Sequence, residues 1–125
     1  MNHDTIKQLL FTYVEGWKSG DREKILRTLD PSCVLIEADG EQFRGKEVIS
    51  RMLDSRVIAG NTVDRWEITS FYVTDQACFF EWGFECTYAG RHHGFEGASI
   101  ARVNQEKIVF LREYATVGPQ GEAES

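Results

Sequence analysis

The sequence predicts one α+β domain in which three N-terminal helices cover a strongly curved antiparallel sheet and enclose an apolar pocket. In the first half, apolar residues recur at steps of three and four, which is the period of a helix. From Thr62 onward the period changes to two, which is the period of strands. A chain of 125 residues, 42% of them hydrophobic, suits one packed domain. We expect this domain to span residues 1–117 and a flexible tail to follow at 118–125.

The first predicted helix begins at a capping box of Thr5 and Gln8 and ends at Gly20. Its apolar stripe consists of Ile6, Leu9, Leu10, Tyr13, Val14 and Trp17. Asp21 can cap a second helix, which Pro31 closes. The inward-facing residues of this second helix are Ile25, Leu26 and Leu29.

A hairpin and a third helix come next. Residues 33–38 are a short β-branched and apolar run, and Asp39-Gly40 is a turn signal that leads to a brief strand at 42–44. Gly45 opens the third helix and Gly60 is placed to end it. The apolar residues of this helix are Val48, Ile49, Met52 and Leu53.

Four long strands complete the predicted fold, near residues 63–73, 78–88, 93–103 and 107–117. The turns between them are short enough to join antiparallel neighbours. On the second of these strands, one face carries Phe80, Trp82, Phe84, Cys86 and Tyr88. The helices must cover this face, and its aromatic residues either fill a core or stand around a pocket.

The opposite face of the sheet is expected to carry Phe71, Phe79 and Phe110 among charged residues. An exposed sheet face that combines aromatic rings with charges is a plausible isologous contact between two copies of the chain. We therefore predict a homodimer that forms through the outer sheet face.

Composition and charge argue against several classes of partner. The net charge is -6, and no segment gathers Lys and Arg into a stripe, so we expect neither nucleic acid nor a membrane surface as a partner. Cys33, Cys78 and Cys86 form an odd set without metal-binding spacing, which predicts reduced core thiols. The first residues lack the pattern of a secretion signal, so we expect a cytoplasmic location.

The order of these elements, with the pieces that accompany them, resembles the SnoaL-like branch of the nuclear transport factor 2-like superfamily. The matching pieces are Tyr13 and Trp17, Gly20-Asp21, Asp30-Pro31, Asp39-Gly40, Phe43 to Glu47, Trp82-x-Phe84, Phe95-x-Gly97, Lys107-Ile108 and Arg112 to Tyr114. The resemblance implies a cone-shaped α+β barrel with a ligand pocket, commonly a homodimer, of the cystatin-like kind. The superfamily includes steroid isomerases, polyketide cyclases, dehydratases, epoxide hydrolases and non-catalytic binders, so the fold alone does not define a function.

The resemblance to ketosteroid isomerases places Tyr13 at the position of an oxyanion-binding tyrosine and Glu37 at the position of a carboxylate base. Ser99 stands where that family has an aspartic acid. Apart from the resemblance, a carboxylate that faces an apolar cavity has a raised pKa, which suits proton abstraction beside a carbonyl group. A phenol can donate a hydrogen bond to the enolate that develops.

Two further groups of polar residues leave alternatives open. On the last strand, either Glu113 faces inward or Arg112 and Tyr114 do, because apolar residues occur on both faces of that strand. An ion pair of Arg112 with Glu96 is a structural alternative. His92 and His93 point to opposite faces, so they do not chelate a metal, and we expect no metal site.

The sequence therefore favours a domain that binds a small apolar or carbonyl-containing molecule and acts on it by proton transfer, as an isomerase, cyclase or dehydratase. Glu37 and Tyr13 are the candidate catalytic residues. The candidate ligand-binding residues are Trp17, Phe80, Trp82, Phe84, Phe95, Ser99 and Glu113. Nucleotide and phosphate motifs are absent, so we expect no cofactor. A non-catalytic binding module and a purely structural dimerisation domain are the alternatives.

Overall fold

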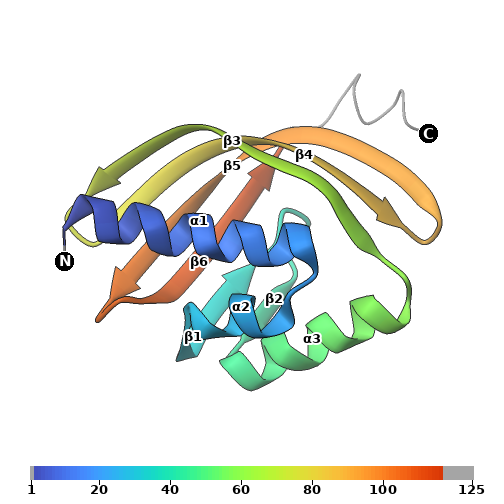
Figure 1. Ribbon diagram of the computed structural model, residues 1–125, viewed down its shortest axis with the longest axis horizontal. Coiled ribbons are helices and arrows are strands. Elements are labelled where there is room, and N and C mark those ends of the chain that lie inside the picture. Colours follow the sequence, from blue (N-terminus) through green and yellow to red (C-terminus); the bar gives the residue numbers. More distant parts are fainter. Residues whose placement is uncertain (1, 117–125) are drawn as a thin grey trace.

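A computed structural model describes residues 2–116 of the chain (Figure 1). Its elements are α1 (His3–Ser19), α2 (Arg22–Arg27), β1 (Leu29–Ile36), β2 (Gln42–Arg44), α3 (Lys46–Ile58), β3 (Thr62–Thr74), β4 (Ala77–Tyr88), β5 (Arg91–Asn104) and β6 (Lys107–Ala115). The predicted order of helices, hairpin and long strands is confirmed. The expected domain end at 117 and the expected tail at 118–125 lie outside the described residues.

The six strands form one sheet in the order β2-β1-β6-β5-β4-β3. The pairings are antiparallel as expected, except that β1 and β6 run parallel. A parallel pair is allowed here because α3 and three long strands separate β1 from β6, so no tight turn forces them to run in opposite directions. The sheet curves strongly but does not close into the expected barrel, since β2 and β3 remain as its two edges.

The helices cover the concave side of this sheet (Figure 1). α1 lies across it and packs against β3, while α3 packs against β1 and β2 at the other end. The pairing of β3 with β4 shifts register between Val63 and Arg65 and again between Ile68 and Ser70. Such irregularities bend and twist a strand, which explains how a sheet of long strands wraps around the helices.

The boundaries of the first helix and strand differ from the predicted ones. The Asn2 side chain caps α1 by accepting a hydrogen bond of 2.8 Å from the Thr5 N–H, so the helix begins two residues before the predicted capping box. Gly20, with φ 67°, ends α1 as predicted. Pro31 lies inside β1 instead of closing α2. β1 tolerates this proline because its pairing with β6 is interrupted between Leu29 and Val34.

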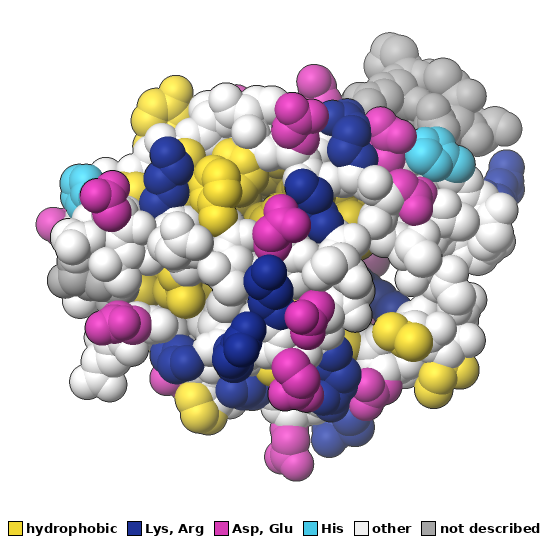
Figure 2. Space-filling model, in the orientation of Figure 1, with side chains coloured by type: hydrophobic (Ala, Val, Ile, Leu, Met, Phe, Trp, Pro, Cys, Tyr) yellow, Lys and Arg dark blue, Asp and Glu magenta, His cyan; other side chains and the backbone are white. Residues whose placement is uncertain are grey.

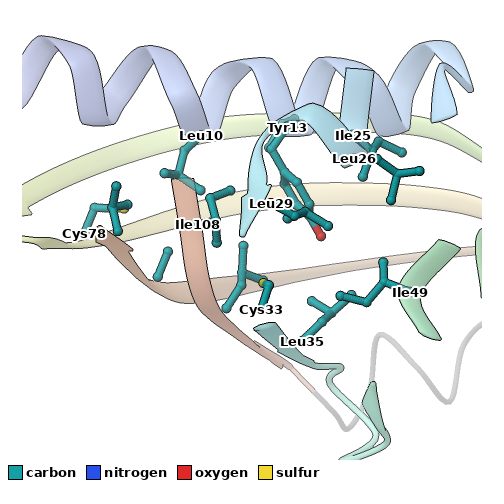
Figure 3. Close-up of a cluster of buried hydrophobic side chains, with 14 of the residues drawn as sticks. Leu10, Tyr13, Ile25, Leu26, Leu29, Cys33, Leu35, Ile49, Cys78 and Ile108 are labelled. Atoms are coloured by element: carbon teal, nitrogen blue, oxygen red, sulfur yellow. The ribbon is translucent and has the colours of Figure 1, made fainter. Parts of the chain in front are cut away.

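One continuous core fills the space between the helices and the sheet (Figure 3). It includes Leu10 from α1, Leu29 and Leu35 from β1, Ile49 from α3 and Ile108 from β6. Side chains from most elements meet in this cluster, so burial of apolar surface holds the helical layer onto the sheet. The core thereby sets the positions of the polar residues that lie beside it.

The outer face of the sheet differs from the prediction at one aromatic residue. Phe71 was expected on this face, but it pairs with Phe80 and stacks on its ring at 5.4 Å, on the concave side. The register shift between Ile68 and Ser70 reverses the alternation of β3 and turns Phe71 inward. Phe79, by contrast, is 41% exposed on the outer face, as expected.

Charges are mixed over the side of the molecule that carries the helices. Figure 2 shows Lys and Arg side chains interspersed with Asp and Glu side chains on this face. Among residues 2–116, no helix is long and apolar enough to cross a membrane.

Candidate functional site

Tyr13 lies at the centre of the candidate site. It projects from α1 toward the sheet with its hydroxyl group directed into the interior (Figure 3), and it is 1% exposed. Its ring centroid lies 6.3 Å from that of Trp17 and 6.2 Å from that of Trp66. Burial, and then the negative charge of Glu113, raise the pKa of Tyr13 well above its usual range. Tyr13 is therefore a hydrogen-bond donor throughout the physiological pH range.

Glu37 forms a two-pronged ion pair with Arg56. The Arg56 Nη1 and Nη2 atoms lie 2.7 and 2.5 Å from the two carboxylate oxygens. The side chains are only 17% (Glu37) and 29% (Arg56) exposed, so water screens this pair less than a surface pair. The guanidinium also lies 5.8 Å from the Trp17 ring and 5.9 Å from the Phe43 ring. Arg56 thus orients the carboxylate that follows β1 and fixes it beside the aromatic residues.

Arg56 is a site residue that the sequence prediction missed. It continues the inward stripe of α3 because it follows Ile49 by seven residues and Leu53 by three. Ile49, Met52 and Leu53 are buried, so a charged residue at the next position of the stripe has to face the interior. A search for charges on apolar stripes would have found it.

Strand pairing shows which residue of β6 faces inward. Glu113 pairs with Ser99, which is fully buried on the concave side. Glu113 therefore points inward, while the Arg112 guanidinium lies 4.9 Å from the Tyr114 ring on the outer side. Arg112 pairs with Ile100 on β5, and its guanidinium contacts the Tyr114 ring. This contact takes the place of the alternative ion pair with Glu96.

The carboxyl group of Glu113 has a raised pKa. Burial, and next the negative charge of Glu37, raise its pKa to about 8, and Arg56 offsets part of this increase. At neutral pH the group is therefore mostly a protonated acid that can donate a hydrogen bond. It lies within electrostatic reach of both Tyr13 and the Glu37–Arg56 pair.

Aromatic rings form one wall of the site. Trp66 and Trp82 are 6.0 Å apart, and Phe84 contacts both of them and stacks on Phe95 at 5.2 Å. Trp17, Phe84 and Phe95 are partly exposed, so the wall reaches the solvent at one end. Trp66 was not among the predicted ligand-binding residues, although it lies on the same face of the sheet as Trp82.

Two predicted site residues have other contacts. Ser99 accepts a hydrogen bond of 2.9 Å from the Trp82 indole N–H, so its hydroxyl group supports the aromatic wall. Phe80 stacks on Phe71, and a further ring, Phe11, lies 5.6 Å from Phe71. Phe80 therefore packs with Phe71 in the core, and its role in ligand binding remains a prediction.

Gly97 permits the position of the Trp82 ring. These two residues are paired on β4 and β5, and a Cβ atom at Gly97 would lie 2.5 Å from the Trp82 ring. It would also collide with the backbone carbonyl of Tyr114. Only glycine leaves room for the indole to contact the strand at this position.

Two open grooves on the described surface lie away from this site. One lies between the start of α1 and the β5–β6 turn, next to Thr5, Arg27 and Lys107. The other lies beside the start of α3, next to Pro31 and Gly45. Both are open grooves, so the internal ligand pocket remains a prediction.

Two further groups of polar residues contain a histidine or a cluster of acids. His92 is exposed, with its ring nitrogens 3.6 Å from Asp64 and 3.2 Å from Glu85. Among residues 2–116, the acidic group close enough to share a cation consists of Glu37, Asp39 and Glu41. Two of these side chains are exposed, and the carboxylate of the third, Glu37, already accepts hydrogen bonds from Arg56.

The family model of the SnoaL-like domain matches residues 11–111. The chain therefore belongs to the SnoaL-like family. A comparison with curated protein sequences found no match.

Solved structures share the fold at low sequence identity. An LEH-like epoxide hydrolase from M. tuberculosis is 14% identical with a TM-score of 0.85, and the match covers 97% of this chain and 90% of that chain. A proposed polyketide cyclase from Xanthomonas campestris pv. campestris is 15% identical with a TM-score of 0.80, covering 100% of both chains. A protein from Catenulispora acidiphila with a ketosteroid isomerase-like fold, in complex with trimethylamine, is 16% identical with a TM-score of 0.78, covering 94% and 91%. These similarities establish the fold.

Proposed function

We propose that this SnoaL-like domain binds a small carbonyl compound and transfers a proton within it without a cofactor. The observation that carries the proposal is a pair of carboxyl groups in different states within one aromatic cluster. Glu113 holds its proton up to about pH 8, whereas Glu37 pairs with Arg56 as a carboxylate. When the surroundings of two acids keep one protonated and the other ionised, the first can serve as a general acid and the second as a general base.

In the proposed step, Glu37 takes a proton from the carbon next to the carbonyl group. The electrons of the C–H bond form the C=C bond of an enol, and the carbonyl oxygen takes the proton of Glu113. Tyr13 donates a hydrogen bond to this oxygen as negative charge develops on it. When the substrate is a β,γ-unsaturated ketone the enol is a dienol, so Glu37 can return its proton to the γ-carbon while the C=C bond moves into conjugation with the carbonyl group. Glu113 recovers its own proton from the enol oxygen, and the product is an isomer of the substrate.

A non-catalytic binding module is the second candidate. Arg56 engages both carboxylate oxygens of Glu37, and the Ser99 hydroxyl group is used by Trp82. Both contacts favour a rigid site that holds a ligand over one that takes up protons. The two candidates differ in whether proton exchange accompanies binding.

Proton exchange at the ligand's α-carbon is the test of the first candidate. A panel of polycyclic enones, phenols and small carboxylic acids would be titrated into the protein while tryptophan fluorescence is followed. For each compound that binds, exchange of the α-hydrogen with deuterated solvent is expected in the wild type. It should fall by about a hundredfold or more in Glu37→Gln, because removing a general base costs that much.

Glu41→Gln is the matched control, since Glu41 lies on the same hairpin with an exposed side chain. It should keep the wild-type exchange rate. Binding without exchange in the wild type would instead identify a binding module.

We further propose that the chain forms a homodimer through the outer sheet face. Apolar residues of neighbouring strands lie side by side there: Phe79 pairs with Ile100, and Ala98 pairs with Tyr114. Arg102 lies 4.8 Å from the Phe110 ring on the same face.

Phe79→Glu is expected to give a monomer, because it would place an unpaired charge in the proposed interface and weaken the dimer by about a hundredfold or more. Sedimentation equilibrium would measure the mass, starting from 14.3 kDa for one chain. Val57→Glu should remain dimeric, since Val57 is 68% exposed on α3, away from the sheet face. A monomeric wild type, or equal association of the two variants, would refute the proposal.

A cytoplasmic location remains part of the proposal. All three cysteines are unpaired, as expected for a reducing compartment. Burial raises the pKa of the Cys33 and Cys78 thiols to about 12, so both stay protonated as parts of the core.

A further inference from the structure

Two indole N–H groups beside Tyr13 are buried without an acceptor. Among residues 2–116, the Trp17 and Trp66 Nε1 atoms have no hydrogen-bond partner. Trp66 is only 4% exposed, so bulk water does not replace the missing acceptor. A buried donor without an acceptor is costly and calls for an explanation, such as a bound molecule that supplies the acceptor.

The third tryptophan of the cluster differs from these two. The Trp82 N–H donates to Ser99, although Trp82 packs against Trp66 in the same aromatic wall. The chain therefore provides an acceptor for the indole group that faces the neighbouring strand. The Trp17 N–H slightly favours the ionised form of Tyr13, but its contact with that hydroxyl does not reach hydrogen-bond geometry.

The donors surround the group that we propose to bind the reacting oxygen. The rings of Trp17 and Trp66 flank Tyr13 at 6.3 and 6.2 Å. Together with the Tyr13 hydroxyl and the protonated Glu113, the indole N–H groups of these two tryptophans make a site rich in hydrogen-bond donors. Such a site favours a ligand that carries oxygen acceptors, and the adjacent aromatic rings favour a flat apolar body.

The charges of the site decide between neutral and anionic ligands. The negative charge of Glu37 is matched by Arg56 through two hydrogen bonds. Glu113 is mostly neutral at neutral pH. Among residues 2–116, Arg56 is the cation that acts on Tyr13 and Glu113, and it is already paired with Glu37, so a carboxylate ligand would be buried without a free cation to pair with.

We propose that Trp66, assisted by Trp17, donates its indole N–H to an oxygen of the ligand and restricts the site to uncharged carbonyl compounds. This inference rests on the proposed function, because it concerns the same site. It adds a specificity-determining residue and a substrate class: planar apolar ketones bind, their hydrocarbon analogues bind more weakly, and the corresponding carboxylates are rejected.

Three probes of nearly equal size test the proposal: acetylnaphthalene, ethylnaphthalene and naphthoate. Acetylnaphthalene is expected to bind about tenfold more tightly than ethylnaphthalene, the advantage of one hydrogen bond to a buried donor, and naphthoate to bind more weakly than either. In nuclear magnetic resonance spectra of the indole N–H groups, the ketone should shift the Trp66 signal. The signal of the Trp82 N–H should move much less, because this group already donates a hydrogen bond to Ser99.

Trp66→Phe should remove the advantage of the ketone over the hydrocarbon, whereas Tyr72→Phe, on the same strand but 64% exposed, should keep it. If a variant does not fold, the indole spectra of the wild type still decide the question. Equal affinities for ketone and hydrocarbon, failure of the ketone to bind, or an unshifted Trp66 signal would overturn the inference. Proton exchange that depends on Glu37 but is unaffected by Trp66→Phe would leave the proposed function standing and refute only the role of Trp66.

Discussion

Glu113→Gln is expected to abolish proton transfer and, at the same time, to stabilise the fold at and above neutral pH. Glutamine has the shape of glutamic acid but carries no transferable proton, so turnover should fall by about a hundredfold to ten-thousandfold. In the wild type, burial and Glu37 raise the pKa of Glu113 from its ordinary 4.5 to about 8. Folding then opposes ionisation of this side chain.

The sign of the pH effect follows from that increase. Below pH 4.5 the carboxyl group is protonated in both the folded and the unfolded chain, so it does not oppose folding. As the pH rises toward about 8, the unfolded chain releases the proton and the folded chain keeps it, so the free energy of unfolding decreases. The loss is on the order of 3 kcal/mol at neutral pH.

Urea unfolding at about pH 5 and about pH 8 would measure this effect in wild type and Glu113→Gln. The wild type should lose stability between the two conditions, and the variant should lose much less. Glu96→Gln is the matched control because Glu96 is exposed on β5, next to the strand that carries Glu113. A pH dependence that is the same in all three proteins would contradict the raised pKa.

Gly97→Ala is expected to destabilise the domain by about 3 kcal/mol. The new methyl group would meet the Trp82 ring and the Tyr114 carbonyl, and the latter belongs to the β6 backbone and has little freedom to move. Relief of the collision requires separation of β5 from β6 or displacement of the indole. Either change would also disturb the Trp82–Ser99 hydrogen bond.

Gly94→Ala provides the comparison on the same strand. A Cβ atom there would meet the Glu85 side chain at 3.6 Å and the Phe84 carbonyl at 3.8 Å, which are ordinary contacts. Denaturant unfolding of the two variants should show a large loss for Gly97→Ala and a change of less than about 1 kcal/mol for Gly94→Ala. Equal losses would mean that intrinsic strand preferences, and not the collision with Trp82, determine the effect.

Local patterns were sufficient to predict the elements of this fold. The cap at Asp21 and the helix end at Gly20 depend on residues next to each other in the chain, and both occur as predicted. The parallel pairing of β1 with β6 was missed because it joins strands separated by most of the chain. Phe71 was placed on the wrong face because a strict period of two does not include a shift of register.

The candidate site was predicted less completely than the fold, for a different physical reason. Tyr13 follows the apolar stripe of a helix, so its inward direction could be read from spacing alone. The direction of Glu113 could not be predicted, since β6 has apolar residues on both faces, and only its pairing with Ser99 decides it. Arg56 was overlooked because charged residues at the end of a helix are usually solvated.

The ionisation of Glu113 is the most direct test of the account as a whole. Carbon nuclear magnetic resonance of the glutamate carboxyl groups, with Glu113→Gln used to assign the signal, would follow its titration. A midpoint of about 8 is expected for Glu113. A midpoint near the ordinary value of 4.5 would mean that Glu113 is a solvated carboxylate at neutral pH, and the proposed acid–base pair would not exist.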